Sequence, residues 1–358
     1  MTRIRSFVLA DVPRVAELHA SVLIATSRLG LEERRDLLRR VFLDSPWHDE
    51  ALPSLVAEAG DGRIVGFLGV LPRRMACNGR PVRVGVTSQY VVAPGHRGLT
   101  GLLLFKRFLA GPQDLSMTDG ASHETVRIWK AVGGTDSIPH SIHWTRPLRP
   151  LRYALSCVSA RIPPAALAAP LGGVLDAIAT RLPRSPLRLT TSLRGEALTV
   201  DAMLDHADEF VSGTALRAEH DRASLKWLLE MAERKTSAGE LRRVLVRDAE
   251  QDVVGLYLYY LARGGASEVL QIAGRPSALT AVVEHLFHDA WRAGATAVSG
   301  RLQPELFDTL KATHCLFHGR GSPVLLHARR RELLDAVRAG AACLTRLDGE
   351  WWMSFQQG

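Results

Sequence analysis

An apolar strand that runs into a glycine-bearing turn and then into an apolar helix constrains the fold of this sequence more than any other feature. The predicted strand ends at Val92, a turn with Arg97 and Gly98 follows, and apolar residues then recur at helical spacing from Leu102 to Leu109. A helix entered this way has unpaired N–H groups at its start, and its dipole adds partial positive charge there. The joint therefore predicts an anion site suited to pyrophosphate, to which Arg97 adds a full charge.

The same turn carries a recognisable motif. Residues 92–104 read Val-x-Pro-x-x-Arg-Gly-x-x-Gly-x-Leu-Leu, which resembles motif A of the GCN5-related N-acetyltransferases (the GNAT superfamily). In that family the turn between the fourth strand and the third helix holds the pyrophosphate of acetyl-CoA, and a splayed fourth strand offers backbone N–H groups to the thioester. The resemblance implies acyl-CoA contacts from Val91, Val92, Arg97, Gly98, Leu99, Thr100, Gly101 and Leu102.

A second motif follows at the expected distance. The stretch from Ser122 to Gly134 is similar to motif B of the same family, Asn-x-x-x-x-x-Leu-Tyr-x-Lys-x-Gly-Phe. The resemblance implies that Ser122 contacts the CoA arm. Trp129 stands where many members keep a tyrosine that protonates the leaving thiolate. An indole N–H is a donor and not a usable acid, so we expect the ring of Trp129 to pack beside the pantetheine arm.

The order of predicted elements is also that of a GNAT fold. A strand over Ile4–Val8 precedes a helix capped by Asp11, and a second helix covers Leu31–Phe42. Turn residues Gly60-Asp61-Gly62 and Asn78-Gly79 then predict antiparallel strands that lead into the glycine turn. Ser137–Trp144 is expected as the closing strand. The fold class is therefore predicted as α/β (α+β), a mixed, mostly antiparallel sheet flanked by helices.

The second half of the chain repeats this order. A helix after Asp221, strands around Val244–Asp248 and Val253–Tyr260, a helix over Ala278–Arg292 and a last strand at Ser322–Ala328 suggest a second GNAT-like fold. Its turn Ala273-Gly274-Arg275-Pro276-Ser277 lacks the phosphate-cradling spacing, so this copy is interpreted as degenerate. The expected domains are an acyl-CoA-binding domain at 1–150, a connecting helical region at 151–215 and the degenerate copy at 216–358.

Composition limits the setting in which such a chain works. The 358 residues contain four cysteines without a Cys-x-x-Cys pair, and no His/Cys cluster suggests a metal. The net charge of +8 has two interpretations: a general bias of the composition toward arginine, or a surface that attracts anions. No basic run has interleaved aromatics, so no nucleic-acid partner is expected. The start of the chain lacks an apolar signal segment, which favours the cytoplasm. Residues 163–188 form either a packed linker helix or a helix lying on an anionic membrane.

Acyl transfer to an amine needs a group that takes a proton from that amine. The predicted fourth strand carries no carboxylate, so the candidate bases lie elsewhere: His123, Glu124, Glu58 and Glu350. Glu350 precedes Trp351 and Trp352, and this tail is either a last strand pinned in the core or an aromatic wall of the acceptor site with Glu350 as base.

Three functions remain open at this point. The first is an acyl-CoA-dependent N-acyltransferase that uses acetyl-CoA or another acyl-CoA and a small-molecule or saccharide amine. The second is a binding or scaffold protein without turnover, because the usual acid and base are absent. The third is a transferase similar to the Fem family that uses aminoacyl-tRNA, which would not need a CoA pyrophosphate cradle.

Overall fold

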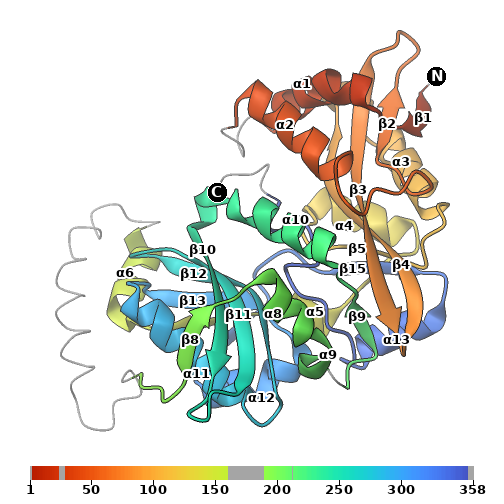
Figure 1. Cartoon of the computed structure of the whole chain (residues 1–358). Coiled ribbons are helices and arrows are strands. Elements are labelled where there is room, and N and C mark those ends of the chain that lie inside the picture. Colours follow the sequence, from red (N-terminus) through yellow and green to blue (C-terminus); the bar gives the residue numbers. More distant parts are fainter. Residues whose placement is uncertain (1, 24–28, 160–188, 212, 354–358) are drawn as a thin grey trace. The chain divides into compact units, whose positions relative to one another are not determined.

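Two compact units make up the computed structural model of this chain (Figure 1). The structure describes residues 2–23, 29–159, 189–211 and 213–353. Unit 1 takes its described residues from Met1–Ser141, Gly213–Ser237 and Gly321–Gly358, and unit 2 from Ile142–Ser212 and Ala238–Arg320. The compact units therefore alternate along the chain, whereas the sequence suggested contiguous ranges at 1–150, 151–215 and 216–358.

Unit 1 is built on a mixed sheet with the order β1-β2-β3-β4-β5-β15-β6, and β9 pairs with the far end of β3. Within it β4 and β5 are parallel. The strands are β1 (Arg3–Ser6), β2 (Leu55–Glu58), β3 (Ile64–Cys77), β4 (Arg80–Val92), β5 (Leu115–Thr118), β6 (Thr135–Asp136), β9 (Leu216–Ala218) and β15 (Leu325–Ala328). The helices are α1 (Val12–Val22), α2 (Leu31–Phe42), α3 (Leu99–Leu109), α4 (His123–Ala131), α5 (Ile138–Ser141), α10 (Arg222–Glu233) and α13 (Arg331–Arg338).

Helices cover both faces of this sheet, and two glycines show which helix covers which face. A Cβ added at Gly69 would lie 2.4 Å from the ring of Phe42, at the end of α2. A Cβ added at Gly66 would lie 3.1 Å from Leu104 and 3.2 Å from Thr100, both on α3. Since neighbouring positions alternate between the faces of a strand, α2 and α3 lie on opposite faces.

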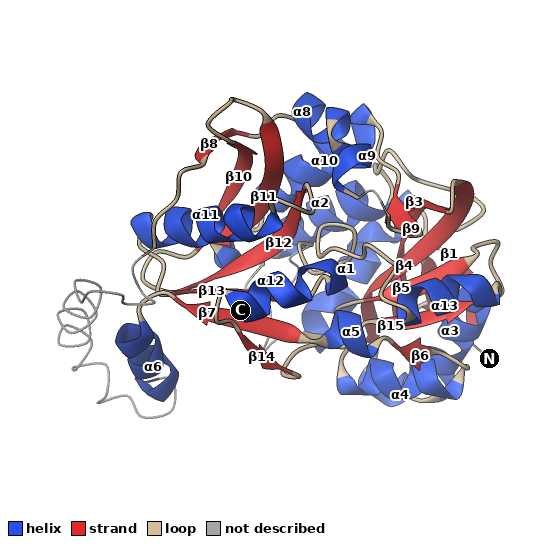
Figure 2. Cartoon of the chain, turned by 90° about the horizontal axis from the view of Figure 1, so that it is seen from below, coloured by secondary structure: helices blue, strands red, loops and turns tan. Residues whose placement is uncertain are grey.

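Unit 2 is built on a second mixed sheet, with the order β14-β7-β13-β12-β11-β10-β8 (Figure 2). Its core packs α11 on the sheet, with Leu286 and Phe287 against Tyr257, Tyr259 and Trp144. The strands are β7 (His143–Pro147), β8 (Arg194–Ala197), β10 (Glu240–Arg247), β11 (Val253–Leu261), β12 (Ala266–Gly274), β13 (Ala297–Arg301) and β14 (Leu316–His318). The helices are α6 (Pro150–Ser159), α8 (Val200–Asp205), α9 (Ala207–Phe210), α11 (Leu279–Arg292) and α12 (Phe307–Ala312).

Local signals in the sequence predicted several elements correctly. The helix expected at Leu31–Phe42 is α2 with the same bounds. Asn78 and Gly79 form the expected hairpin turn, and both have positive φ angles of 50° and 74°, as a two-residue turn between antiparallel strands requires. Asp221 caps α10 by accepting a hydrogen bond from the amide of Ser224 at 2.8 Å. The α/β class with mostly antiparallel sheets flanked by helices is confirmed.

The two closing strands were assigned to the wrong sheets. Ser137–Trp144 is not one strand: a short helix, α5, occupies part of it, and β7 begins at His143 and pairs with β13 and β14 in unit 2. The strand expected at Ser322–Ala328 in the second copy is β15, which pairs with β5 and β6 in unit 1. Alternation of apolar residues identifies a strand but does not specify its partner, which explains both errors.

Two smaller expectations also differ from the structure. Residues 346–353 form turns and bends, so the tail is not a last strand. Asp11 lies at the start of α1 but makes no capping bond from its side chain to the helix. Its buried carboxylate instead pairs with Arg5 at 2.6 Å and Arg14 at 2.7 Å and accepts from the amide of Val8 at 3.1 Å. The Asp11 carboxylate is thus bound by two arginines and does not cap α1 as predicted.

The expected membrane-contact segment, residues 163–188, lies outside the described residues. In the parts of the chain that the structure describes, no helix combines the length and the apolar character needed to span a bilayer.

Candidate functional site

The strands β4 and β5 of unit 1 separate in the middle of the sheet. They pair only from Val84–Val86 on β4 to Leu115–Met117 on β5, although β4 continues to Val92. A β-bulge lies beyond the paired part: Phe67 of β3 faces Val91 and Gly69 faces Ser88, so β4 has one residue more than β3 between these pairs. Gln89 in the bulge has a φ of 52°. Bulges bend a strand and end its pairing, and this one accompanies the divergence.

His19 of α1 holds Gln89 in the bulge, and His19 is in turn bound by Arg34 of α2. His19 of α1 lies with Nε2 2.8 Å from Oε1 of Gln89, and its Nδ1 lies 2.6 Å from a guanidinium nitrogen of Arg34 on α2. Burial lowers the pKa of His19 to about 4, so the ring is neutral. Because Arg34 can only donate, Nδ1 accepts and Nε2 donates to Gln89. The helices α1 and α2 are thereby tied to the distorted part of β4.

The turn after β4 has the geometry of an anion cradle. Gly98 precedes α3 with a φ of 93°, a conformation that glycine adopts readily and a β-branched residue does not. No side chain caps α3, so the amides of Leu99, Thr100 and Gly101 in its first turn point beyond the helix start. Arg97 is exposed and has no ion-pair partner in the part of the chain that the structure describes.

Tyr90, which the sequence analysis did not single out, brings this turn together with α4. A Cβ added at Gly101 would lie 2.1 Å from the hydroxyl oxygen of Tyr90 and 3.2 Å from Ile128 of α4. The hydroxyl is buried and has no hydrogen-bond partner among the described residues. Burial and the charge of Glu124 raise the pKa of Tyr90 to about 12, against the opposing charge of Arg97. The hydroxyl is therefore an unused donor between α3 and α4.

The residues predicted from motif B divide into surface and core positions. Ser122 caps α4, and its hydroxyl accepts from the amide of Thr125 at 3.3 Å. His123 is exposed, and Glu124 is half-buried in the first turn of α4. Trp129 is fully buried, and its ring packs edge-on against Phe105 with centroids 5.9 Å apart. Trp129 is thus part of the core between α3 and α4 in this structure.

Glu350 connects the two diverging strands. Its carboxylate accepts hydrogen bonds from the hydroxyl of Thr118 and, at 3.0 Å, from the amide of Gly120, which follows β5. A further hydrogen bond comes from Ser88 on β4. The amide of Glu350 donates to Asp119 at 2.7 Å. Among the candidate bases, Glu350 is the one bound at the divergence, whereas Glu58 lies in an ion pair with Arg5 at 2.6 Å.

Burial, together with a neighbouring charge, decides the protonation of Glu350. Burial and the negative charge of Asp119 raise its pKa to about 7, although the hydrogen bonds from Thr118, Ser88 and Gly120 act in the opposite direction. Burial alone would also raise the pKa of Asp348, but the hydrogen bond and charge of His220 at 3.1 Å bring it below its usual value. Glu350 therefore exchanges its proton near neutral pH, as a general base requires.

Arg73 supplies the buried positive charge in this region. It is fully buried on β3, and its guanidinium lies 4.9 Å from the ring centre of Trp47 and 5.9 Å from that of Trp352. Burial lowers its pKa to about 10, while Asp348 and Asp119 act in the opposite direction, so Arg73 is charged at neutral pH. Its Nε and Nη2 atoms have no hydrogen-bond partner in the described part of the chain. Stacking on aromatic faces stabilises such a cation.

Metal ligands do not cluster in the residues that the structure describes: no group of three or more His, Cys, Asp or Glu side chains could hold an ion. The four cysteines are free thiols.

Comparison with solved structures shows which fold this is. A probable N-acyltransferase from Enterococcus faecalis matches with a TM-score of 0.59 and 8% identity, over 92% of this chain and 73% of that one. A GCN5-related N-acetyltransferase from Anabaena variabilis matches with a TM-score of 0.59 and 11% identity, over 92% and 74%. An N-myristoyltransferase from Saccharomyces cerevisiae with bound myristoyl-CoA matches with a TM-score of 0.53 and 10% identity, over 92% and 79%.

No family model and no curated protein matches the sequence. At these identities the solved structures establish the fold, and they are GNAT acetyltransferases and relatives. The chain therefore has the fold of the GNAT acetyltransferases.

Replacing Glu350 by glutamine should change how the stability of unit 1 depends on pH. With a raised pKa, the folded protein retains this proton up to about pH 7, while the unfolded chain loses it near the ordinary value. The stabilisation is complete below the unfolded pKa and is lost as the pH rises through 7. Since glutamine has no such proton, Glu350→Gln should gain roughly 1–3 kcal/mol relative to wild type between pH 5 and 8.

Urea unfolding at several pH values, followed through tryptophan fluorescence, measures this difference. Glu50→Gln, at an exposed position, is the matched control and should not reproduce the trend. A difference between Glu350→Gln and wild type that stays constant from pH 5 to 8 would contradict the raised pKa.

Proposed function

We propose that this chain is an acyl-CoA-dependent N-acyltransferase that moves an acyl group from acetyl-CoA, or another acyl-CoA, to an amine. One observation carries the proposal: an uncapped helix start, preceded by Arg97 and Gly98, lies directly after the strand that diverges from its neighbour. The pyrophosphate would bind the amides of Leu99–Gly101 and Arg97, because helix starts and arginine both favour phosphate oxygens.

The thioester would lie along the diverging part of β4. Backbone amides of Val91 or Val92 would polarise its carbonyl, and the pantetheine arm would pass between α3 and α4 near Leu102, Ser122 and the Tyr90 hydroxyl. Preorganised N–H donors of this kind stabilise the oxyanion that forms when the amine attacks. The degenerate second copy would not form a second CoA site.

Glu350 is proposed as the general base. The amine nitrogen attacks the carbonyl carbon, and its proton passes to the Glu350 carboxylate. The C–S bond then breaks, and the electron pair leaves on sulfur as the CoA thiolate. A thiol with a pKa of about 8.5 is an adequate leaving group near neutral pH. His123 and Glu124 are the alternative bases, and their exposed or half-buried positions make them weaker candidates.

Arg97→Ala should weaken acetyl-CoA binding by roughly 1.5–3 kcal/mol, because a hydrogen bond to a charged group is lost. Gly98→Val should weaken it at least as much, since valine is strained at a φ of 93° and prevents close approach of the backbone. Isothermal titration calorimetry measures both.

Arg107→Ala is the matched control for this measurement, because Arg107 is exposed in the last turn of the same helix. Unchanged affinity in Arg97→Ala and Gly98→Val would exclude the cradle. Binding of two CoA molecules per chain would exclude a degenerate second copy.

The rate of transfer should depend on the ionisation of Glu350. With a pKa of about 7, the base becomes active as the pH rises through 7, so kcat should rise over that range. Glu350→Gln should lower kcat by about 10²–10⁴-fold and remove this rise, while acetyl-CoA still binds. If Glu350→Gln keeps the wild-type pH–rate profile, Glu350 is not the general base. If transfer activity is lost only in His123→Ala or only in Glu124→Gln, that residue is the general base instead.

Tyr90 is proposed to donate a hydrogen bond to the departing sulfur. A pKa of about 12 keeps its hydroxyl protonated, so it stabilises the thiolate without fully transferring its proton. Tyr90→Phe should lower kcat by roughly tenfold, in line with one hydrogen bond to a charged group, with little change in CoA affinity. Tyr153→Phe in unit 2 is the control. Unchanged kcat in Tyr90→Phe would show that the thiolate leaves unassisted.

Two alternatives remain as outcomes of these experiments. CoA binding without transfer of labelled acetyl groups to amines in a cell extract would favour a binding or scaffold protein. Absence of CoA binding together with use of aminoacyl-tRNA would favour a Fem-like transferase. The cytoplasm and a small-molecule or saccharide amine remain our proposed setting and acceptor, and peripheral membrane contact through 163–188 remains a prediction.

A further inference from the structure

The hydroxyl of Ser88 links Glu350 to the distorted part of β4. Ser88 is 3% exposed and directly precedes Gln89 of the bulge. Its hydroxyl bonds to the Glu350 carboxylate and also lies 3.3 Å from the side-chain nitrogen of Gln89. A hydroxyl carries one hydrogen, so it donates to only one neighbour at a time. The direction of the bond to Glu350 therefore depends on how the Gln89 carboxamide is oriented.

The buried pair behind Gln89 fixes that orientation. Arg34 can only donate, so Nδ1 of His19 accepts, and the neutral ring carries its hydrogen on Nε2. This Nε2 lies 2.8 Å from Gln89 and needs an acceptor there, which is the carboxamide oxygen. The NH2 group of Gln89 therefore points to Ser88 and donates to it. Ser88 accepts from Gln89 and keeps its own hydrogen for Glu350.

Every hydrogen bond of this series thus runs in the same direction, toward the carboxylate. The four donating side chains are named here the donor chain: Arg34, His19, Gln89 and Ser88. Arg34 is 2% and His19 0% exposed, so water has little access to the inner bonds. Hydrogen bonds in series polarise one another, and the positive charge at the start of the chain strengthens the donor at its end.

The charged groups around Glu350 increase the importance of its hydrogen bonds. Burial and the charge of Asp119, which follows β5, both disfavour the ionised form of Glu350. The positive charge of Arg73 on β3 acts on Asp348 and Asp119, and His220 acts on Asp348. In the described part of the chain no cation pairs with Glu350 directly. The hydrogen bonds to its carboxylate therefore stabilise the ionised form.

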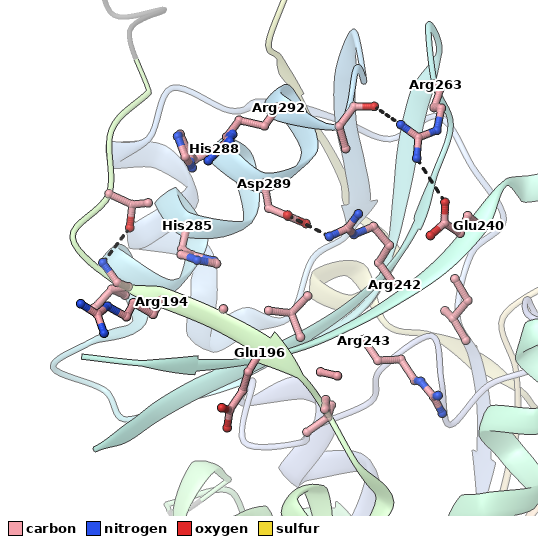
Figure 3. A pocket seen from close by; sticks show the side chains of 18 residues that line it. Arg194, Glu196, Glu240, Arg242, Arg243, Arg263, His285, His288, Asp289 and Arg292 are labelled. Carbon is pink, nitrogen blue, oxygen red and sulfur yellow. Dashed lines mark hydrogen bonds and ion pairs between the residues drawn. The ribbon is translucent and has the colours of Figure 1, made fainter. Parts of the chain in front are cut away.

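A carboxylate in unit 2 has the opposite arrangement. Asp289 of α11, in the lining of a cavity, pairs with Arg242 at 3.1 Å, as Figure 3 shows. It also accepts from the hydroxyl of Tyr259 at 2.7 Å. An adjacent cation thus neutralises the charge of Asp289, whereas neutral donors bind Glu350.

We propose that the donor chain positions Glu350 for its reaction: it keeps the Ser88 hydroxyl donating to the carboxylate and so favours the ionised form. Without the chain, the hydroxyl would be free to turn and accept a hydrogen from protonated Glu350, an arrangement that favours the acid. The four side chains act through Glu350 and are positioning residues. Their role in acyl transfer rests on the proposed function, whereas their effect on the ionisation of Glu350 does not.

The ionisation of Glu350 is measurable in the full chain without CoA or an amine. Carbon-13 NMR of protein labelled at the glutamate carboxyl carbon follows each glutamate, and the signal lost in Glu350→Gln identifies Glu350. Ser88→Ala should raise the pH midpoint of this signal by roughly one pH unit, because a hydrogen bond to the ionised form is lost. Gln89→Met keeps the side-chain length without the carboxamide. It should raise the midpoint by less, since the Ser88 hydroxyl remains but is no longer fixed.

Ser54→Ala is the matched control, because Ser54 is a buried serine of unit 1 whose hydroxyl bonds to the backbone of Val70, outside the donor chain. It should leave the midpoint unchanged, and Ser88→Thr, which retains the hydroxyl, should stay close to wild type. An unchanged midpoint in Ser88→Ala or in Gln89→Met would overturn the proposal, as would an equal rise in Ser54→Ala.

Steady-state kinetics of the same variants separates this proposal from the proposed function. The pH at which kcat reaches half its maximum should rise in Ser88→Ala and Gln89→Met by the amounts that NMR gives. If the NMR midpoint rises while the pH–rate profile stays in place, the donor chain is retained and Glu350 is not the general base.

Discussion

The short pairing between β4 and β5 is the constraint on which the rest of unit 1 depends. Only three residues of each strand pair before the bulge at Gln89 bends β4 away. Beyond that point the polar groups of both strands need other partners, because burying them unpaired is costly. The carboxylate of Glu350 is one such partner, because it accepts hydrogen bonds from Thr118, Gly120 and Ser88. The divergence therefore requires the C-terminal segment beside it, and in the proposed function the thioester would lie there.

A small set of buried charges explains why Glu350 is the group that titrates. Asp348 is held ionised by His220, and Arg73 faces the charges of Asp348 and Asp119 without bonding to either. Glu350 forms no ion pair within the described part of the chain, and burial makes a further negative charge there more costly. The proton consequently stays on Glu350 until about pH 7. The basicity that the proposed mechanism uses is a property of the cluster as a whole.

Local and long-range features of the sequence differ in what they predict. The helix at Leu31–Phe42 and the turn at Asn78-Gly79 follow from periodicity and turn chemistry, and both are confirmed. The strands with which β7 and β15 pair cannot be predicted from such local signals, because apolar alternation is the same for any sheet. Arg73 and Tyr90 were not identified either. Their roles come from burial among residues far apart in sequence, although two adjacent arginines, Arg73 and Arg74, in an otherwise apolar strand were a visible signal.

The turns that precede α3 and α11 show how similar elements differ in anion affinity. In unit 1 Arg97 has no ion-pair partner in the described chain, and Gly98 adopts the left-handed conformation before the helix. In the turn before α11 of unit 2, Arg275 pairs with Glu209 at 2.6 Å, so its charge is already used. The free arginine of that helix, Arg292, lies in its last turn. Of these two turns, the one before α3 therefore keeps the free charge that the proposed pyrophosphate cradle uses, whereas the free positive charge of α11 lies at the opposite end of that helix.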